Sequence, residues 1–139
     1  MRSVEECYHG RNVRVFRLDG DGVVARLQAR ARVLLEQEPD VVEVRLFGSL
    51  ARGDAHPGSD ADLFVVLDDG AGPFLDRIPR LMRYFGGVGI GCDLIAYTES
   101  ERAVLAERQD AFCHAVLDEG IVLAQRAPDP AQRAAPKER

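Results

Sequence analysis

Residues 46–67 read LFGSLARGDAHPGSDADLFVVL, so two apolar runs enclose a polar stretch. The first run ends in the pair Gly48 and Ser49. The second run opens with Asp60 and Asp62, one residue apart. Backbone N–H groups and a hydroxyl in such a turn can hold phosphate oxygens, and paired carboxylates can hold a divalent metal. The stretch therefore predicts a site for a metal–nucleoside triphosphate complex.

The spacing of the two aspartates supports this interpretation. Side chains alternate along a strand, so Asp60 and Asp62 project together while Ala61 points away. Two carboxylates that close repel each other, and their pKa values separate unless a cation neutralises them. Mg²⁺ suits the site because it takes hard oxygen ligands and usually keeps phosphates and waters in its shell. A lone D-x-D or Gly-Ser pair is common in ordinary turns, and only their conjunction favours a functional site.

The flanking periodicity predicts an α/β domain. Residues 41–47 alternate as a strand, and residues 62–67 are almost wholly apolar, as in a strand covered on both faces. A short helix over residues 49–52 would favour an anion at its start. Further helices are expected over residues 23–37 and 74–85 and further strands over residues 11–18 and 92–97, with Pro79 either kinking the second helix or starting another.

The segment that follows predicts a helix with marked ends. Thr98 and Glu101 have the spacing of a capping box. The helix would run to about Glu119 with a break near Gln109, and Gly120 would end it in left-handed geometry. The glycine-rich residues 86–91 lack the lysine of a phosphate loop and precede a strand, so they predict a flexible turn. The pair Asp68 and Asp69 stands beside Gly and Pro, which is typical of a solvated turn.

The composition agrees with a small cytoplasmic enzyme. The chain has 139 residues, enough for one domain with a single core. It contains no apolar run long enough to cross a bilayer and no apolar leader at its start. Its three cysteines are widely spaced, which favours reduced thiols over a disulfide framework or a zinc site. The net charge of −5 and the absence of a Lys/Arg-rich block argue against nucleic acid as a partner.

The pattern GSLARG followed by SDADL resembles the signature of the DNA polymerase β-like nucleotidyltransferase superfamily, in its minimal branch. That signature is a G-S pair, an R-G shortly after it, and S-D-x-D followed by an apolar residue. The stretch CDLIAY supplies the third carboxylate that the family carries on a later strand. The resemblance covers residues 13–123, and its matching positions are Gly48, Ser49, Arg52, Gly53, Ser59, Asp60, Asp62, Leu63 and Asp93.

This resemblance implies a single α/β nucleotidyltransferase domain with a mixed sheet and helices mainly on one face. We expect this domain over residues 11–124. Residues 1–10 are expected to be loosely ordered, and the proline-rich residues 125–139 to be disordered.

The resemblance also implies the chemistry. Asp60 and Asp62 would bind Mg²⁺ or Mn²⁺ and the triphosphate of ATP or another NTP, while Gly48 and Ser49 would hold the outer phosphates. Asp93 would complete a second metal site and assist the acceptor hydroxyl. Attack at the α-phosphorus would then move a nucleoside monophosphate, with AMP from ATP as first choice, to that hydroxyl.

Two further members of the pattern have two interpretations each. Arg52 either contacts phosphate or only pairs with Asp54. Ser59 either belongs to the nucleotide site or caps and orients the D-x-D loop.

Two classes of function follow. Minimal members similar to this chain pair with a small helical HEPN protein as antitoxin and toxin, and the transferase can adenylylate a toxin tyrosine. Alternatively the chain is a catalytically quiet binding module that neutralises its partner by occupancy. The complete set of Asp60, Asp62 and Asp93 favours the active enzyme, with a protein or a small molecule as acceptor.

Overall fold

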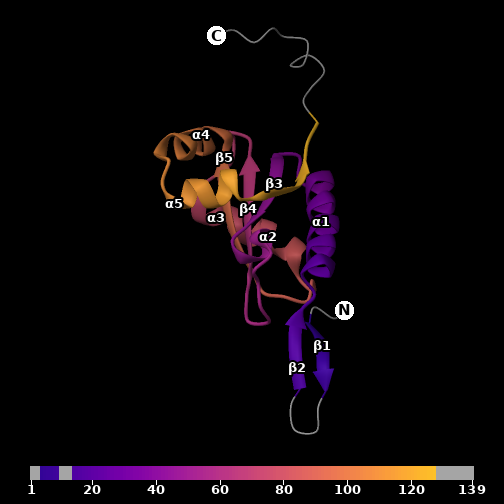
Figure 1. Ribbon diagram of the computed structural model, residues 1–139. Coiled ribbons are helices and arrows are strands. Elements are labelled where there is room, and N and C mark those ends of the chain that lie inside the picture. Colours follow the sequence, from indigo (N-terminus) through magenta and orange to yellow (C-terminus); the bar gives the residue numbers. More distant parts are fainter. Residues whose placement is uncertain (1–3, 10–13, 128–139) are drawn as a thin grey trace.

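The two apolar runs of residues 46–67 are neighbouring antiparallel strands in the computed structural model, which describes residues 4–9 and 14–127. They are β3 (Val41–Phe47) and β4 (Ala61–Leu67). β5 (Cys92–Thr98) adds parallel to β4, and β6 (Ile121–Gln125) adds antiparallel to β3. The sheet order is β5-β4-β3-β6, with helices beside it (Figure 1). The predicted α/β fold with a mixed sheet is confirmed.

One face of the sheet packs against α1 (Gly20–Gln37) and α3 (Phe74–Met82). The predicted apolar stripe of α1 is confirmed by its buried residues, which are Val23, Leu27, Ala31 and Leu34. The helix begins at Gly20, earlier than predicted, because the Asp19 carboxylate accepts a hydrogen bond from the Gly22 N–H (3.1 Å) and caps it. Pro79 lies inside α3 without ending it, and a 3₁₀ turn at Arg83–Phe85 follows.

The other face carries a second, smaller core. It is formed by α4 (Glu99–Arg108), α5 (Ala111–Cys113) and a π-helical turn at His114–Asp118, packed against Phe64 and Val66 of β4. Successive side chains of β4 point to opposite faces and both sets are apolar, so both faces need cover. This second layer departs from the expectation of helices mainly on one face.

The ends of α4 were predicted in part. The capping box is confirmed: the Thr98 hydroxyl accepts from the Glu101 N–H (3.2 Å), and the Glu101 carboxylate accepts from the Thr98 N–H (2.7 Å). The predicted break is confirmed at Gln109, which adopts φ 51°. The left-handed geometry predicted for Gly120 is wrong, because its φ is not positive. A Cβ there would lie 2.2 Å from the Val116 carbonyl oxygen, so the glycine is required by a close backbone approach.

A hairpin of β1 (Val4–His9) and β2 (Arg14–Leu18) extends from the end of the molecule where α1 begins (Figure 1). It starts inside the segment that was predicted to be loosely ordered. The predicted tail begins within β6, and residues 128–139 lie outside the described part of the chain. The domain boundaries therefore stay a prediction.

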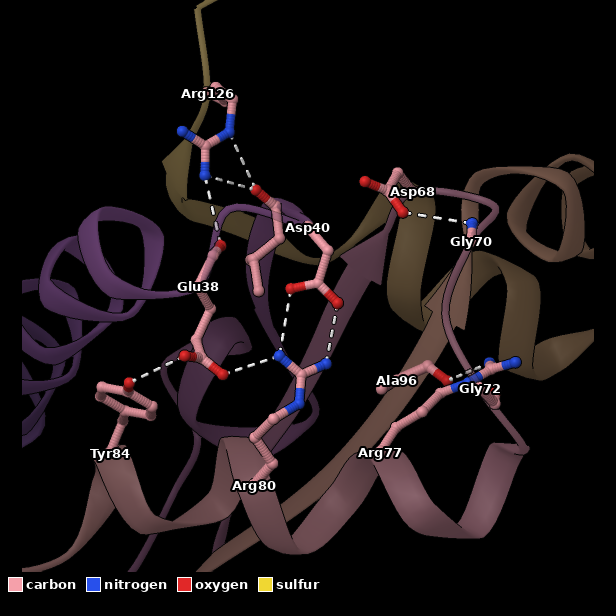
Figure 2. A network of polar contacts seen from close by, with 11 residues as sticks. Glu38, Asp40, Asp68, Gly70, Gly72, Arg77, Arg80, Tyr84, Ala96 and Arg126 are labelled. Atoms are coloured by element: carbon pink, nitrogen blue, oxygen red, sulfur yellow. Dashed lines mark hydrogen bonds and ion pairs between the residues drawn. The ribbon is translucent and has the colours of Figure 1, made fainter.

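The start of β3 is tied to its neighbours by a polar network (Figure 2). Arg80 of α3 donates to the carboxylates of Glu38 (2.7 Å) and Asp40 (2.8 Å), and the Tyr84 hydroxyl donates to Glu38 (3.2 Å). Hydrogen bonds from Arg80 hold the pKa of Asp40 below its usual value. Arg126, after β6, donates to backbone carbonyls at the same place. These polar groups are hydrogen-bonded to one another, so we assign this end of the sheet a structural role.

Within residues 4–9 and 14–127, no helix is both long enough and apolar enough to cross a bilayer. In that same part of the chain, Cys92 and Cys113 are free thiols.

Candidate active site

The predicted site residues gather at the opposite end of the sheet, where β3 leaves it and β4 and β5 enter. Because β3 and β4 are antiparallel, the end of one lies beside the start of the other, and Phe47 is opposite Asp62. Because β4 and β5 are parallel, their starts lie side by side, and Asp62 is opposite Asp93. The backbone therefore brings the D-x-D pair, the Gly-Ser turn and the third carboxylate to one place.

Gly48 occupies a position that only glycine suits. Its φ of 79° lies in the region that favours glycine. A Cβ on Gly48 would also come within 2.3 Å of a carboxylate oxygen of Asp62. Another residue would thus strain the backbone and displace the Asp62 carboxylate.

The turn after Gly48 is held by its own backbone. The predicted helix is confirmed as α2 (Ser49–Arg52), with Gly53 in left-handed geometry at its end. The Arg52 N–H donates to the Gly48 carbonyl (3.1 Å), and the Asp54 N–H donates to the Ser49 carbonyl (3.0 Å). Among the described residues, no side chain caps the start of α2. The first turn can therefore offer N–H groups and the half-buried Ser49 to an anion.

The three carboxylates repel one another. Asp60 and Asp93 are exposed and Asp62 is half-buried. The pKa of Asp62 is raised, chiefly because burial removes water from its carboxylate, and further because Asp93 and Asp60 are negative; the positive charge of Arg52 opposes the shift. A cation at this position would relieve the repulsion.

Cys92 pairs with Ala61 next to the aspartates and packs against the larger core, and the sequence analysis did not single it out. It directly precedes Asp93, and that adjacency was the available signal. Burial, then the charges of Asp60 and Asp93, raise the pKa of its thiol to about 11. The thiol is therefore protonated at neutral pH, which makes Cys92 a poor nucleophile or metal ligand.

The structure describes partners for the two ambiguous residues. Arg52 pairs with Asp54 (3.2 Å) at the surface. The Ser59 hydroxyl accepts a hydrogen bond from the His56 N–H (3.0 Å), which holds the loop before the D-x-D pair. Both contacts match the structural interpretations, and the guanidinium of Arg52 still acts on Asp62 electrostatically.

The donor set fits Mg²⁺ or Mn²⁺ bound together with a nucleotide. In the described ranges, no three or more His, Cys, Asp or Glu side chains lie so that they could hold a metal ion by themselves. Mg²⁺ is usually held by one or two carboxylates together with substrate phosphates rather than by an all-protein cage. Three oxygen donors from Asp60, Asp62 and Asp93, beside a turn that can hold phosphate, have the chemistry of such a site.

A hollow of about 310 Å³ lies beside α2. Leu50, Gly53 and Ala55 line it together with the hairpin and the start of α1. The three aspartates are not among its lining residues. The hollow therefore adjoins α2 and the loop that follows it rather than the carboxylates.

Comparison with known families agrees with this geometry. A family model described as a nucleotidyltransferase domain matches residues 29–114, which is more than half of the 139 residues. The span contains every predicted site residue. No curated protein matches the chain.

Similar solved structures include a crystal structure from Sulfolobus solfataricus at 1.40 Å resolution, provisionally assigned as a nucleotidyltransferase. It has 20% identity and a TM-score of 0.56, and the match covers 77% of this chain and 84% of that chain. At this identity, the likeness shows the fold alone. A toxin–antitoxin structure with AMP-PNP has 24% identity and a TM-score of 0.48 over 71% of this chain and 73% of that chain. That TM-score is too low to carry an argument.

Proposed function

The chain belongs to the nucleotidyltransferase domain family, and from this premise we propose that it moves AMP from ATP to an acceptor hydroxyl. The observation that carries the proposal is the register that sets Asp62 opposite Asp93, with the Asp62 carboxylate against Gly48. Nucleotidyl transfer needs carboxylates beside a turn that can hold phosphate, and this register supports that combination.

Each residue has a role in the proposed reaction. Asp60, Asp62 and Asp93 would hold Mg²⁺ or Mn²⁺ at two positions, and Gly48 and Ser49 would hold the outer phosphates. When bound, the metal supplies positive charge that stabilises the attacking and leaving oxygens. Arg52 and Ser59 make hydrogen bonds within the loop between these groups, and we assign both a role in nucleotide binding.

The proposed step is an in-line displacement. The acceptor hydroxyl oxygen forms a new bond to the α-phosphorus while the bond from that phosphorus to the bridging oxygen breaks, and pyrophosphate leaves. In this proposal the Asp93 carboxylate takes the hydroxyl proton, because it is exposed and therefore open to an approaching acceptor.

For the acceptor, we propose a hydroxyl of a protein partner of the HEPN type, as the resemblance to the minimal branch implies. A small-molecule hydroxyl is the other candidate. The net charge of −5 weighs against nucleic acid, because a nucleic-acid backbone attracts a basic surface.

A labelling experiment tests the proposal. The protein is incubated with the product of the neighbouring reading frame, Mg²⁺ and ATP labelled at the α-phosphate, alongside the Asp60→Asn/Asp62→Asn variant. We expect label on the acceptor with the wild type only, since nucleotidyl transfer retains the α-phosphorus. ATP labelled at the γ-phosphate serves as the control for kinase activity and should transfer nothing.

Two other outcomes would contradict the proposal. Transfer of γ-label would identify a kinase. If neither label moves while the double variant binds its partner as tightly as the wild type, the protein acts by occupancy, which is the binding-module alternative.

A further inference from the structure

The face that carries the three aspartates has a fourth position, Gly91, which carries no side chain. Ala61 pairs with Cys92 and Asp62 with Asp93, and the Ala61 N–H donates to the Gly91 carbonyl (2.8 Å). The same register one step earlier sets Asp60 beside Gly91. Since side chains alternate along strands, the pairs Asp60/Gly91 and Asp62/Asp93, which are two residues apart, share one face, and three of these four positions hold carboxylates.

The carboxylate of Asp60 uses the space that Gly91 leaves. A Cβ on Gly91 would lie 2.6 Å from one carboxylate oxygen of Asp60 and 3.5 Å from its carboxyl carbon. Real Cβ contacts are essentially never shorter than 3.0 Å. The alanine methyl and the present position of the Asp60 carboxylate therefore exclude each other.

The backbone itself does not require glycine at this position. Among the described glycines, positive φ values occur at Gly48, Gly53, Gly87 and Gly89, and Gly91 is not one of them. An L-residue can adopt the conformation of Gly91 without strain, so space is the reason for glycine here. The sequence alone had suggested a flexible turn for this glycine run.

We propose that Gly91 is a positioning residue of the transfer site: by carrying no side chain, it sets where the Asp60 carboxylate lies. The effect that we expect of Gly91 on metal and nucleotide binding rests on the proposed function above. The placement of the Asp60 side chain does not rest on it, because that placement follows from the contact distance alone.

The test compares Gly91→Ala with Gly86→Ala. Gly86 belongs to the same glycine-rich connection, has φ −70°, and a Cβ on it would meet nothing within 4 Å. Three-bond NMR couplings at the β-carbon of Asp60 report its side-chain rotamer without any ligand. We expect the rotamer populations of Asp60 to change in Gly91→Ala and to stay at wild-type values in Gly86→Ala. Both variants should unfold within about 2 °C of the wild type, because the displaced atom is the free end of an exposed side chain.

Mn²⁺ binding, measured by isothermal titration calorimetry in the presence of ATP, gives the second readout. We expect Gly91→Ala to weaken Mn²⁺ binding about tenfold, as is typical when a ligand loses its support. In an Asp60→Ala background, Gly91→Ala should cause no further loss, since no carboxylate is left to displace.

The outcomes separate this inference from the proposed function. Unchanged Asp60 rotamers in Gly91→Ala overturn the inference, and so does an equal loss of Mn²⁺ affinity in both backgrounds. A wild type that binds no Mn²⁺ contradicts the proposed function, while the coupling measurement still decides the role of Gly91.

Discussion

Asp62 of β4 lies directly opposite Asp93 of β5, although 30 residues separate them in the chain numbering. The parallel register of the two strands makes this contact, and α3 with its following turn fills the connection between them. The pair accumulates negative charge at the start of both strands. The proposed function and the predictions below depend on that charge.

Asp62→Asn should stabilise the metal-free protein at neutral pH. The folded state raises the pKa of Asp62, so it binds the proton more tightly than the unfolded chain does. The stability of the wild type therefore begins to fall as the pH rises above about 3.8, the ordinary pKa of aspartate. The loss is complete once the pH exceeds the raised pKa of Asp62 in the folded protein. Thermal unfolding from pH 3 to pH 7 should show the variant gaining relative to the wild type by a few degrees as pH rises.

Asp69→Asn supplies a control of opposite sign. Hydrogen bonds from the backbone and hydroxyl of Ser100 lower the pKa of Asp69. The stability that these hydrogen bonds give is fully present above the pKa that Asp69 has in the unfolded chain, and it is lost as the pH falls through the lower pKa of the folded protein. Asp69→Asn should therefore be less stable than the wild type at pH 7 and equal to it in acid. If Asp62→Asn follows the same trend as Asp69→Asn, the account of charge repulsion at the site is wrong.

Gly48→Ala should strain the backbone and displace the Asp62 carboxylate. The strain of a positive φ costs about 1–2 kcal/mol, and the displaced carboxylate should weaken ATP binding in the presence of Mg²⁺ at least tenfold. Gly53→Ala is a matched control, because Gly53 has φ 83° but a Cβ on it would meet nothing within 4 Å. Chemical denaturation and calorimetry of both variants separate the two effects, and equal ATP affinities would contradict a role for Gly48 beyond its φ.

Arg52→Ala tests whether this arginine acts on phosphate. Its pair with Asp54 is exposed, so its loss should change stability by less than about 1 kcal/mol. If the guanidinium reaches the nucleotide, Arg52→Ala should weaken ATP binding about tenfold or more, whereas Asp54→Ala should leave it unchanged or slightly stronger. Equal effects of both variants would assign Arg52 to loop structure alone.

Mg²⁺ and ATP together should raise the melting temperature far more than either does alone. A ligand that binds only the native state stabilises it by about 2.7 kcal/mol at one hundred times its Kd. Differential scanning fluorimetry with Mg²⁺, with ATP, and with both measures this coupling, and Asp62→Asn should abolish it. Equal ATP binding in the presence of a chelator would rule out the metal model.

Local patterns in the sequence predicted much of the fold. The bounds of β3 and α2 were predicted without error, since alternation and turn chemistry act between near neighbours. The capping box at Thr98 was likewise predicted from residues three apart. The error at Gly120 has the opposite origin, because its constraint is a close approach to the Val116 carbonyl that no propensity encodes.

The sequence by itself determined which chemical groups the site contains: a Gly-Ser turn, a D-x-D pair and a third aspartate at the start of a later strand. It could not determine that Asp62 stands opposite Asp93 or that Gly91 leaves room for Asp60. Those relations arise when β4 and β5 pair in one particular register. A shift of one residue would turn the side chains to the other face, so only the packing of the whole sheet, with apolar residues buried on both faces, selects this register.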